Sequence, residues 1–378
     1  MWRRVEIRNY RSIEKVSVDL APFTLLVGPN GSGKSNFADA LVFVRDVAFD
    51  AMSAVERRGG MPAIAKWRPT KPADLTVDVR AASSKAGLET DYIRHQLTIR
   101  SGRAHPWFFR RELVELIAKG DEKLRLRRDR NQLTHDSLGL PELEGTASAM
   151  LSARQFRSMG KSAALRAVKR LHFDVEAMQE PQWDAEVTPL LESGANIAAA
   201  YRSLPSDAQE FVLLAMQNIV PGLSSIFVEP IDRYLLLKFK QKQYGGEEAT
   251  FPAAAMSDGA LRALGILVAA QQITKDELLI IEEPEVAIHV GAAQLLFEIL
   301  KRASRRGAVL VTTHSADLLD AAKDEEILVC SYDEGVTKIG PLASSQRDIV
   351  KEGLFSLAEL MRSEPLRIEG EPSPTISP

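Results

Sequence analysis

Short apolar segments near the N-terminus predict three strands and then a helix. Residues 5–7 and 16–18 alternate between apolar and polar side chains, as a pair of half-buried strands does. Residues 23–27 are almost entirely apolar and predict a third strand. A glycine-rich turn follows, and from about Lys34 the apolar residues recur at helical spacing, so we expect a helix to begin there.

Later segments predict that the sheet continues, is interrupted and then returns. Residues 75–79 and 92–99 alternate with period two and predict antiparallel strands of the same lobe. From about residue 110 to residue 218 the pattern is mostly helical. Residues 231–243 and two further apolar strands bring the sheet back. Residues 369–378 are polar and rich in proline, and we expect them to be disordered.

Composition argues against a membrane-embedded protein. The chain has 378 residues, of which 45% are apolar, enough for one large domain or two ordinary ones. No apolar run approaches the roughly 20 residues that span a bilayer, and the first residues lack the apolar stretch of a signal peptide. The single cysteine, Cys330, lies in an apolar run and is expected to be a buried, unreactive thiol. We therefore expect a cytoplasmic protein without a membrane partner.

Charge is unevenly distributed along the chain. The formal net charge of -3 gives no overall attraction to nucleic acid. Residues 94–172, called the basic segment below, nevertheless hold 17 Lys/Arg and 8 Asp/Glu, a net charge of +9. These cations either line one face and neutralise the phosphates of a nucleic acid, or they form an ordinary solvated helical face. The helical spacing of Arg154, Arg157 and Lys161 favours a patch.

The glycine-rich turn has the pattern of a phosphate-binding loop, G-x-x-x-x-G-K-[ST]. Its residues are Gly28, Pro29, Asn30, Gly31, Ser32, Gly33, Lys34 and Ser35, and Asn36 follows them. Glycines let successive N–H groups point at phosphate oxygens, and the helix adds the partial positive charge of its N-terminus. We expect Lys34 to bridge the β- and γ-phosphates and the Ser35 hydroxyl to ligate magnesium.

A second apolar strand, residues 278–281, ends in the carboxylates Glu282 and Glu283. Such a strand delivers acids to the carboxyl edge of the sheet, beside the phosphate loop. Glu282 is expected to hold magnesium, through a water molecule, and Glu283 to orient and deprotonate the attacking water. Adjacent acids after a strand are often only a solvated turn, and the loop upstream is what favours chemistry here.

A third apolar strand, residues 309–313, ends at His314. A histidine at this edge can hydrogen-bond the γ-phosphate and the attacking water, and so sense the third phosphate. A single histidine is usually structural, but its position behind two matching motifs favours a functional role.

A fourth motif, Ser257, Asp258 and Gly259, precedes an apolar helical run. Ser257 suits the N-cap of that helix, and Gly259 leaves its first turn uncrowded. Taken alone, the motif predicts only a capped helix.

The order of these motifs resembles that of the ABC ATPases of the SMC, RecF and OLD group. Within the group the chain is most similar to stand-alone bacterial AAA-family ATPases, whose motifs read L-S-D-G-x-x-R, E-E-P-E-x-x-x-H-P and T-T-H-S. Residues 257–259, 282–285 and 313–315 match them, and residues 9–12 are similar to the N-F-R-S strand end of the group. The resemblance covers both sheet-forming ends of the chain and is weaker in the middle.

This resemblance implies ATP and Mg²⁺ as ligands and ATP hydrolysis as the reaction. In that group two molecules sandwich two ATPs, and the signature serine and its helix bind the γ-phosphate held by the opposite subunit. The resemblance thus implies that Ser257, Asp258 and Gly259 act in trans, in a homodimer or higher homo-oligomer, and that Arg11 contacts phosphate. An uncrowded helix N-terminus is physically suited to bind an anion.

The chain also departs from the pattern of the group. Val290 stands where the group has proline after His289, so the geometry of that turn is not defined by the resemblance. No glutamine loop is recognisable between residues 36 and 94, and the residue that contacts adenine is therefore not assigned.

Together these patterns predict an α/β fold, a P-loop NTPase with an ABC-ATPase head. The head would combine a mixed central sheet, an antiparallel β lobe and a helical insertion. The predicted parts are residues 1–100 (the N-terminal part of the head, with the phosphate loop), 101–225 (a mainly helical insertion), 226–345 (the C-terminal part of the head, with the other motifs) and 346–378 (a C-terminal helix and a disordered tail).

Three functions stay open. The first, implied by the resemblance, is an ATP-driven switch that controls a separate effector, such as a nuclease, in anti-phage defence. The second is a RecF-like DNA-repair ATPase that clamps duplex DNA, with the basic segment as the contact surface. The third is a scaffold that assembles on ATP without DNA. The sequence contains neither the long coiled coil of SMC proteins nor the TOPRIM acids of OLD proteins, which argues against these two subtypes.

Overall fold

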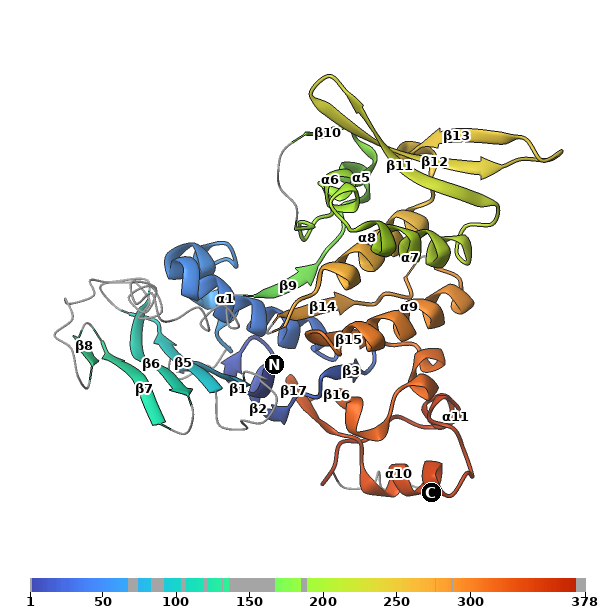
Figure 1. Cartoon of the computed structure of the whole chain (residues 1–378). Helices are drawn as coiled ribbons and strands as arrows, with labels where there is room; N and C mark the ends of the chain where they lie inside the picture. The colour runs from blue at the N-terminus through green and yellow to red at the C-terminus, as the bar shows by residue number, and fades with distance from the viewer. Residues whose placement is uncertain are drawn as a thin grey trace.

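A mixed sheet of thirteen strands forms the frame of the molecule (Figure 1). The computed structural model describes residues 2–66, 74–82, 92–102, 107–118, 121–130, 132–135, 167–184, 189–275, 277–286 and 288–371. The strands of this sheet are β1 (Trp2–Tyr10), β2 (Ile13–Asp19), β3 (Phe23–Val27), β4 (Leu75–Ala82), β5 (Tyr92–Arg100), β6 (Phe108–Ala118), β7 (Asp121–Asp129), β8 (Gln132–His135), β9 (Val168–Leu171), β14 (Leu278–Glu282), β15 (Ala308–Thr313), β16 (Ile327–Asp333) and β17 (Val336–Pro341). They lie in the order β8-β7-β6-β5-β4-β1-β2-β17-β16-β3-β15-β14-β9.

The sheet has a parallel part and an antiparallel part. Strands β9, β14, β15, β3 and β16 run parallel to one another, and β2, β1 and β4 to β8 form an antiparallel meander. Between these two parts, β17 pairs antiparallel with β16 and parallel with β2. In Figure 1 the antiparallel lobe extends to the left of the parallel part. This is the mixed sheet with an antiparallel lobe that the sequence predicted.

A second, antiparallel sheet stands apart from the first. Its strands are β10 (Gln182–Trp183), β11 (Leu223–Ile231), β12 (Tyr234–Lys242) and β13 (Glu248–Pro252). Strand β12 pairs with β11 along one edge and with β10 and β13 along the other. The expectation that residues 231–243 rejoin the main sheet is therefore wrong. Period-two alternation shows that a strand has one buried face but does not show which sheet it joins.

Helices cover both faces of the parallel part. They are α1 (Lys34–Glu56), α2 (Met61–Ile64), α5 (Val175–Gln179), α6 (Ile197–Arg202), α7 (Ser206–Gln217), α8 (Asp258–Gln272), α9 (Val290–Ala303), α10 (Ser344–Lys351) and α11 (Leu357–Ser363), with short 3₁₀ turns at η2 (Ala253–Ala255), η3 (Ala316–Ala321) and η4 (Asp324–Glu326). Helix α1 belongs to one core, on one face, and α6 to α9 belong to a second core on the opposite face.

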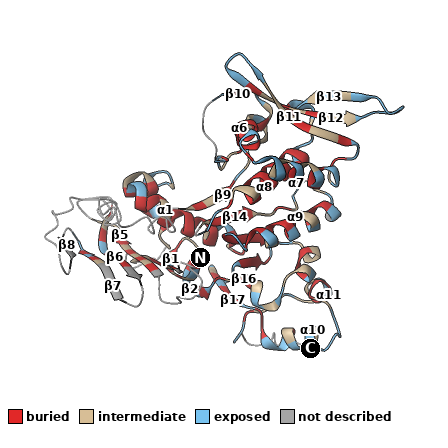
Figure 2. Cartoon of the chain, viewed as in Figure 1, coloured by how far each residue is buried: buried red, intermediate tan, exposed pale blue. Residues whose placement is uncertain are grey.

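The inner parallel strands β3, β14 and β15 are largely apolar because alternate residues enter different cores. On β14, Leu278 and Ile280 pack beside α1, whereas Leu279 and Ile281 pack beneath α6 to α9. Strands buried on both faces carry continuous apolar runs rather than alternating ones. Figure 2 shows this central region as the most deeply buried part of the chain.

The mostly helical pattern predicted from about residue 110 is wrong for residues 108–135, which form β6 to β8. The period of two was hidden because charged side chains occupy inward positions. Glu112 on β6 is buried and lies 2.8 Å from the ring nitrogen Nε2 of buried His95 on β5. Arg128 on β7 is only 2% exposed and stacks on the ring of Phe109. The helices predicted farther along this stretch correspond to α5, α6 and α7.

The C-terminal part contains two helices rather than one. Helices α10 and α11 follow β17, and residues Leu342 and Ile368 form an isolated antiparallel bridge that returns the chain to the end of β17. Residues 372–378 of the predicted disordered tail lie outside the described residues. None of the helices in the described ranges is both long enough and apolar enough to cross a membrane.

Candidate nucleotide site

The phosphate loop joins the end of β3 to the start of α1, and its glycines fit that path. Gly31 and Gly33 have φ angles of 76° and 107°, in the left-handed region that favours glycine. A Cβ atom on Gly33 would lie 2.1 Å from the hydroxyl oxygen of Thr337, and one on Gly28 would lie 2.1 Å from the carbonyl oxygen of Cys330. The loop therefore packs against β16 and β17 without room for side chains at these positions.

The loop offers hydrogen-bonding groups to an anion. No side chain caps the first turn of α1, which leaves its N–H groups for a ligand. The Ser32 hydroxyl is buried, and among the described residues it has no hydrogen-bond partner. The Ser32 carbonyl oxygen, on the other hand, accepts hydrogen bonds from Thr337 Oγ1 (2.8 Å) and Cys330 Sγ (3.4 Å). Contacts with β16 and β17 thus hold the loop in place, and the uncapped N-terminus of α1 fits a phosphate group.

Cys330 is the buried thiol that the sequence predicted. It is 1% exposed, and burial raises the pKa of its thiol to about 11. The sulfur is therefore a protonated donor at neutral pH, with a structural contact to the phosphate loop.

Lys34 lies inside the loop with its side chain 6% exposed. Its ammonium group donates hydrogen bonds to the carbonyl oxygens of Gly28 (2.7 Å) and Pro29 (3.0 Å). The same Nζ atom lies 4.0 Å from Glu283 Oε1. The positive charge thus faces the end of β14, where the sequence predicted the hydrolytic carboxylate.

Ser35 and Glu282, the two predicted magnesium ligands, are in direct contact. Ser35 Oγ donates a hydrogen bond to Glu282 Oε2 at 2.6 Å. They meet because β14, β15 and β3 are neighbouring parallel strands that end at the same edge, with Glu282 in register with Thr312 and Thr313 in register with Val27. A hydroxyl and a carboxylate are oxygen ligands of the kind that Mg²⁺ prefers, so the pair fits this ion.

Glu283, Glu285 and His314 form a cluster at the same edge. Glu283 has a φ angle of 47°, and its N–H donates to the carbonyl oxygen of Thr312 at 2.9 Å. His314 Nδ1 lies 3.3 Å from Glu283 Oε1 and 3.8 Å from Glu285 Oε1. The Thr313 hydroxyl donates to Glu285, which holds that carboxylate in place. The acid and histidine motifs are therefore brought together, as the sequence predicted.

The turn after these acids ends at His289, directly before α9. His289 is the N-cap of α9, and its Nδ1 accepts a hydrogen bond from the N–H of Gly291 at 3.3 Å. Val290 is therefore the first helical residue. The chain begins α9 with valine at the position where the similar ATPases have proline.

Ser257, Asp258 and Gly259 lie away from the phosphate loop of the same chain. Ser257 is the N-cap of α8 and accepts a hydrogen bond from the N–H of Ala260 at 3.3 Å. Ser257 and Asp258 are exposed, whereas Gly259 is buried. Within the described ranges, no hydrogen bond or ion pair joins this motif to residues 28–36. The capped helix is as predicted, and its trans role stays a prediction.

Arg11 and Asn36 lie side by side at the first turn of α1. Arg11 has a φ angle of 47°, and one guanidinium nitrogen donates to Asn36 Oδ1 at 3.4 Å. A second nitrogen of Arg11 lies 3.0 Å from Asp39 Oδ2. Asn36 donates in turn to the Ser12 hydroxyl at 2.7 Å. Arg11 thus lies next to the residue that follows the phosphate loop, and its contact with phosphate stays a prediction.

Sequence analysis missed a residue of this site, Arg170. It lies on β9, where it is in register with Ile280 of the neighbouring β14. Its Nε donates a hydrogen bond to Glu282, and another guanidinium nitrogen lies 3.8 Å from Asp39 Oδ1. The sequence offered only its place in the basic segment, since the strand pairing that brings it to Glu282 leaves no local pattern.

Among the other described cations of the basic segment, Arg94, Arg111, Arg125 and Arg127 lie on one face of the antiparallel lobe, where acidic residues pair with some of them. Arg94 pairs with Asp78, Arg125 pairs with Glu115, and Arg128 is buried. Residues 136–166, which include Arg154, Arg157 and Lys161, lie outside the described residues. The proposed DNA-contacting patch therefore stays a prediction for the whole basic segment.

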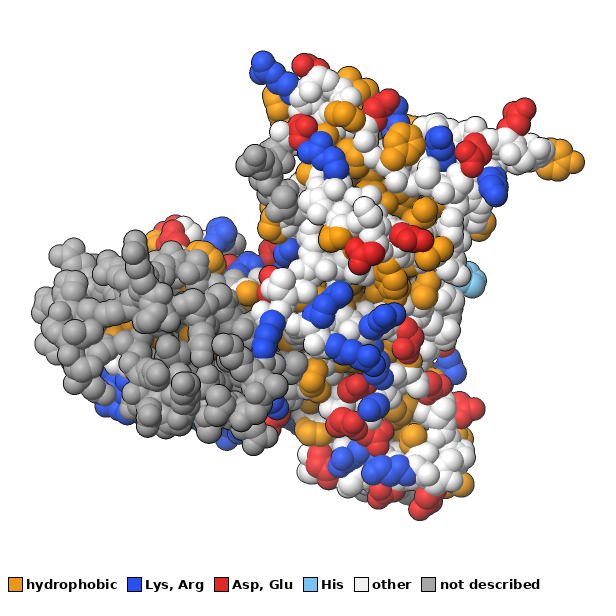
Figure 3. All heavy atoms as spheres, in the orientation of Figure 1, with side chains coloured by type: hydrophobic (Ala, Val, Ile, Leu, Met, Phe, Trp, Pro, Cys, Tyr) orange, Lys and Arg blue, Asp and Glu red, His pale blue; other side chains and the backbone are white. Residues whose placement is uncertain are grey.

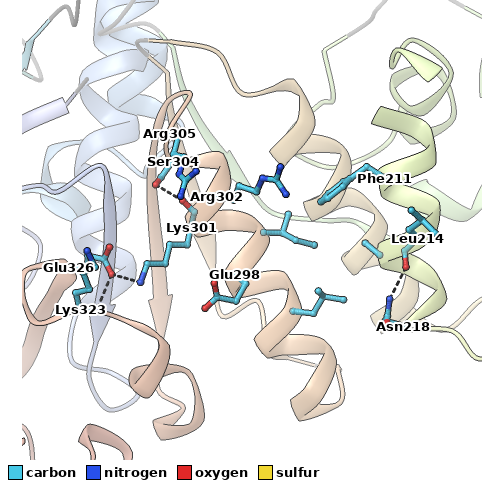
Figure 4. A pocket seen from close by; sticks show the side chains of 13 residues that line it. Phe211, Leu214, Asn218, Glu298, Lys301, Arg302, Ser304, Arg305, Lys323 and Glu326 are labelled. Carbon is cyan, nitrogen blue, oxygen red and sulfur yellow. Dashed lines mark hydrogen bonds and ion pairs between the residues drawn. The ribbon is translucent and has the colours of Figure 1, made fainter. Parts of the chain in front are cut away.

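Among the described residues, a large cavity lies away from the phosphate loop and a smaller one borders it. A groove of about 890 Å³ lies between α7 and α9, with Phe211 and Leu214 on one side and Glu298 and Arg302 on the other (Figure 4). Acidic and basic side chains are mixed over this face of the molecule (Figure 3). The smaller cavity, of about 640 Å³, is lined in part by Asn30 and His314 and borders the loop. The larger groove contains none of the motif residues, whereas the smaller cavity includes residues of the phosphate loop and His314.

The fold is that of the SMC head domains. Residues 23–320 match the model of the family described as "AAA domain, putative AbiEii toxin, Type IV TA system". This match spans most of the chain, and the chain belongs to that family. By this match it is a protein of the AAA class.

Solved structures of SMC heads share the fold over nearly the whole chain. The Smc head bound to the C-winged helix domain of ScpA superposes with a TM-score of 0.58 at 16% identity, over 92% of this chain and 99% of that chain. The Smc head domain of Pyrococcus furiosus, with an extended coiled coil and bound to the C-terminal domain of ScpA, gives 0.55 at 15% identity, over 93% and 99%. At these identities the likeness concerns the fold alone.

Similarity in sequence to named proteins is confined to short segments. A segment of 42 residues is 52% identical to the chromosome partition protein Smc of Methanocaldococcus jannaschii, which is 11% of this chain and 4% of that protein. A segment of 44 residues is 39% identical to the OLD nuclease of Thermus scotoductus, which is 12% of this chain and 8% of that protein. The chain thus matches only a small fraction of the length of these relatives.

Proposed function

We propose that this protein hydrolyses ATP with Mg²⁺ and works as a nucleotide switch through an ATP-sandwiched homodimer. The observation that carries the proposal is the direct contact between Ser35 of the phosphate loop and Glu282 of β14, with Lys34 beside Glu283. Ser35 and Glu282 would hold the metal ion, which neutralises phosphate charge when it is bound. The loop N–H groups and Lys34 would hold the β- and γ-phosphates.

In this proposal Glu283 is the general base. Its carboxylate would accept the proton of the attacking water, and His314, 3.3 Å away, would orient that carboxylate and contact the γ-phosphate. Lys34, 4.0 Å from Glu283, would stabilise the charge that develops on the transferred phosphoryl group. The arrangement of three motif residues within reach of one another supports hydrolysis rather than nucleotide binding alone.

The exposed start of α8 supports the dimer. Ser257 and Asp258 are exposed, and the helix that they begin is 15 residues long, so its N-terminal partial charge is open to an anion from another molecule. A γ-phosphate held by the partner would supply contacts that exist only in the closed dimer. Those contacts would make association depend on the third phosphate.

We further propose that the switch controls a separate effector, such as a nuclease, in anti-phage defence. The description of the family refers to a toxin–antitoxin system, and one sequence relative is an OLD nuclease, which supports this setting. The alternative is a RecF-like ATPase that binds duplex DNA directly. It is favoured by the net charge of +9 in residues 94–172 and weakened by the internal ion pairs of Arg94 and Arg125.

The dimer can be tested with Ser257→Arg. The bulky cation would leave the phosphate loop of its own chain intact and would block approach of the partner, so ATP affinity should be retained and ATP-dependent association lost. Static light scattering with and without Mg-ATP measures the association. Ser356→Arg is the matched control, because Ser356 caps α11 through the N–H of Glu359 in the same way. A dimer that persists in Ser257→Arg would rule out the trans role.

A further inference from the structure

Both carboxylate oxygens of Glu282 are engaged in hydrogen bonds within the protein. Ser35 Oγ donates to Oε2 at 2.6 Å, and Arg170 Nε donates to Oε1. The proposed metal ligand is therefore already neutralised by a protein cation. An arginine beside a carboxylate forms a charge-assisted hydrogen bond, which is stronger than a neutral one, so this contact competes with a metal ion.

A second carboxylate lies within reach of the same guanidinium. Arg170 is 3.8 Å from Asp39 Oδ1, on the α1 helix that begins in the phosphate loop. Asp39 does not depend on Arg170, because it also pairs with Arg58 (3.1 Å) and Arg11 (3.0 Å). Arg170 can therefore leave Glu282 for Asp39 without exposing an unpaired buried charge.

The local charge explains why a cation is needed before the metal arrives. Glu282, Glu283 and Glu285 end β14 within a few residues, and Lys34 is shared between Glu283 and the loop carbonyls. A triphosphate that enters this edge without a metal ion would meet bare carboxylates. Like charges a few ångströms apart repel by several kcal/mol even at an effective dielectric constant of about 20.

We propose that Arg170 takes the place of the metal ion at Glu282 in the nucleotide-free protein, and that Mg²⁺ arriving with ATP displaces it toward Asp39. Arg170 is thus a positioning residue of the nucleotide site, and this inference rests on the proposed function.

The test compares Arg170→Met with the natural chain in binding a fluorescent ATP analogue, with EDTA or with saturating Mg²⁺. Without metal, the variant leaves Glu282 uncompensated, and its affinity should fall at least about tenfold. With Mg²⁺ the metal neutralises Glu282, and the affinity should return to within about threefold of the natural chain. Arg170→Lys keeps the charge and should bind in EDTA much better than Arg170→Met.

A double variant separates this role from a structural one. In Arg170→Met with Glu282→Gln, the carboxylate that needs compensation is gone, so metal-free affinity should recover relative to Arg170→Met. Arg202→Met is the control, because Arg202 on α6 pairs with the exposed Asp184 and with none of the described residues of the nucleotide site. It should change neither measurement.

The outcomes separate a failure of the role of Arg170 from a failure of the proposed function. Equal metal-free affinity of Arg170→Met and the natural chain would overturn the role of Arg170. So would a loss in both buffers that Glu282→Gln does not restore, since that pattern indicates lost structure. Failure of the natural chain to bind the analogue in either buffer would instead refute the proposed function, and this inference with it.

Discussion

Glu282 and Glu283 are neighbours in the chain, yet they face different partners. Glu282 contacts Ser35 and Arg170, whereas Glu283 lies beside Lys34 and His314. Successive residues of a strand point to opposite faces, and the left-handed φ of 47° at Glu283 turns the chain so that both carboxylates reach one edge. A residue with a side chain pays about 1–2 kcal/mol for that conformation, and such strain concentrates at functional sites.

Glu283→Gln should lower ATP turnover at least about 100-fold, because an amide cannot accept the proton of the attacking water. ATP binding should persist, since the phosphate loop is unchanged, and the uncleaved complex should accumulate as the dimer. Steady-state phosphate release measures turnover. The control is Glu298→Gln, a matched change at an exposed site on α9 in the groove away from the loop. Unimpaired turnover in Glu283→Gln would assign the base to another group.

At the scale of residues, the sequence predicted which motif residues lie together at the sheet edge, but not every residue that contacts them. Ser35, Glu282, Glu283 and His314 were expected at one edge because each follows an apolar strand or turn with a recognisable pattern. Arg170 was not, because its charge was counted with the basic segment and its partner lies 112 positions away. Contacts that depend on strand order leave no trace in a local pattern.

At the scale of elements, the antiparallel lobe carries buried charge where the rule of alternation expects apolar residues. His95 on β5 and Glu112 on β6 have side chains that are 0% exposed and face each other at 2.8 Å. The ring nitrogen Nδ1 of His95 is buried and has no partner in the described part of the chain. These inward polar positions explain why the sequence suggested helix where the chain forms β6 and β7, whereas the cleaner alternation of β4 and β5 was predicted correctly.

Glu112→Ala should lower the free energy of unfolding by about 1–3 kcal/mol, because it leaves the buried imidazole of His95 without its hydrogen-bond partner. Urea denaturation followed by circular dichroism measures the change. Asp184→Ala provides the comparison, since the ion pair of Asp184 with Arg202 is at the surface and should contribute little. If the two variants were equally stable, the His95–Glu112 pair would not be a stabilising feature of the lobe.

At the scale of the whole molecule, strands from both ends of the chain are neighbours in one sheet. Strand β3 comes from the first 30 residues and lies between β15 and β16, which come from beyond residue 300. The four motifs therefore depend on long-range pairing. The sequence predicted this convergence because each motif needs the others for its chemistry. It did not predict the second sheet, whose strands β11 and β12 have the same alternation as strands of the main sheet.

A variant of the basic segment, residues 94–172, can distinguish an effector switch from an ATPase that binds DNA directly. Arg154→Glu with Arg157→Glu reverses two charges of this segment. If the segment contacts duplex DNA, the affinity of the variant for DNA should fall at least about tenfold. The negative slope of log K against log salt should become shallower by about 2, because two phosphate contacts are lost. Fluorescence anisotropy with a short duplex, over a series of salt concentrations, measures both.

Arg302→Glu with Arg305→Glu is the matched control, since these arginines have the same spacing of three and are exposed on and after α9. It changes the net charge by the same amount, so an equal loss of affinity would indicate a general charge effect rather than a contact surface. Absence of measurable binding by the natural chain at low salt would exclude direct DNA recognition. The effector switch and the ATP-assembled scaffold would then remain as the reasons for the protein to couple ATP to association.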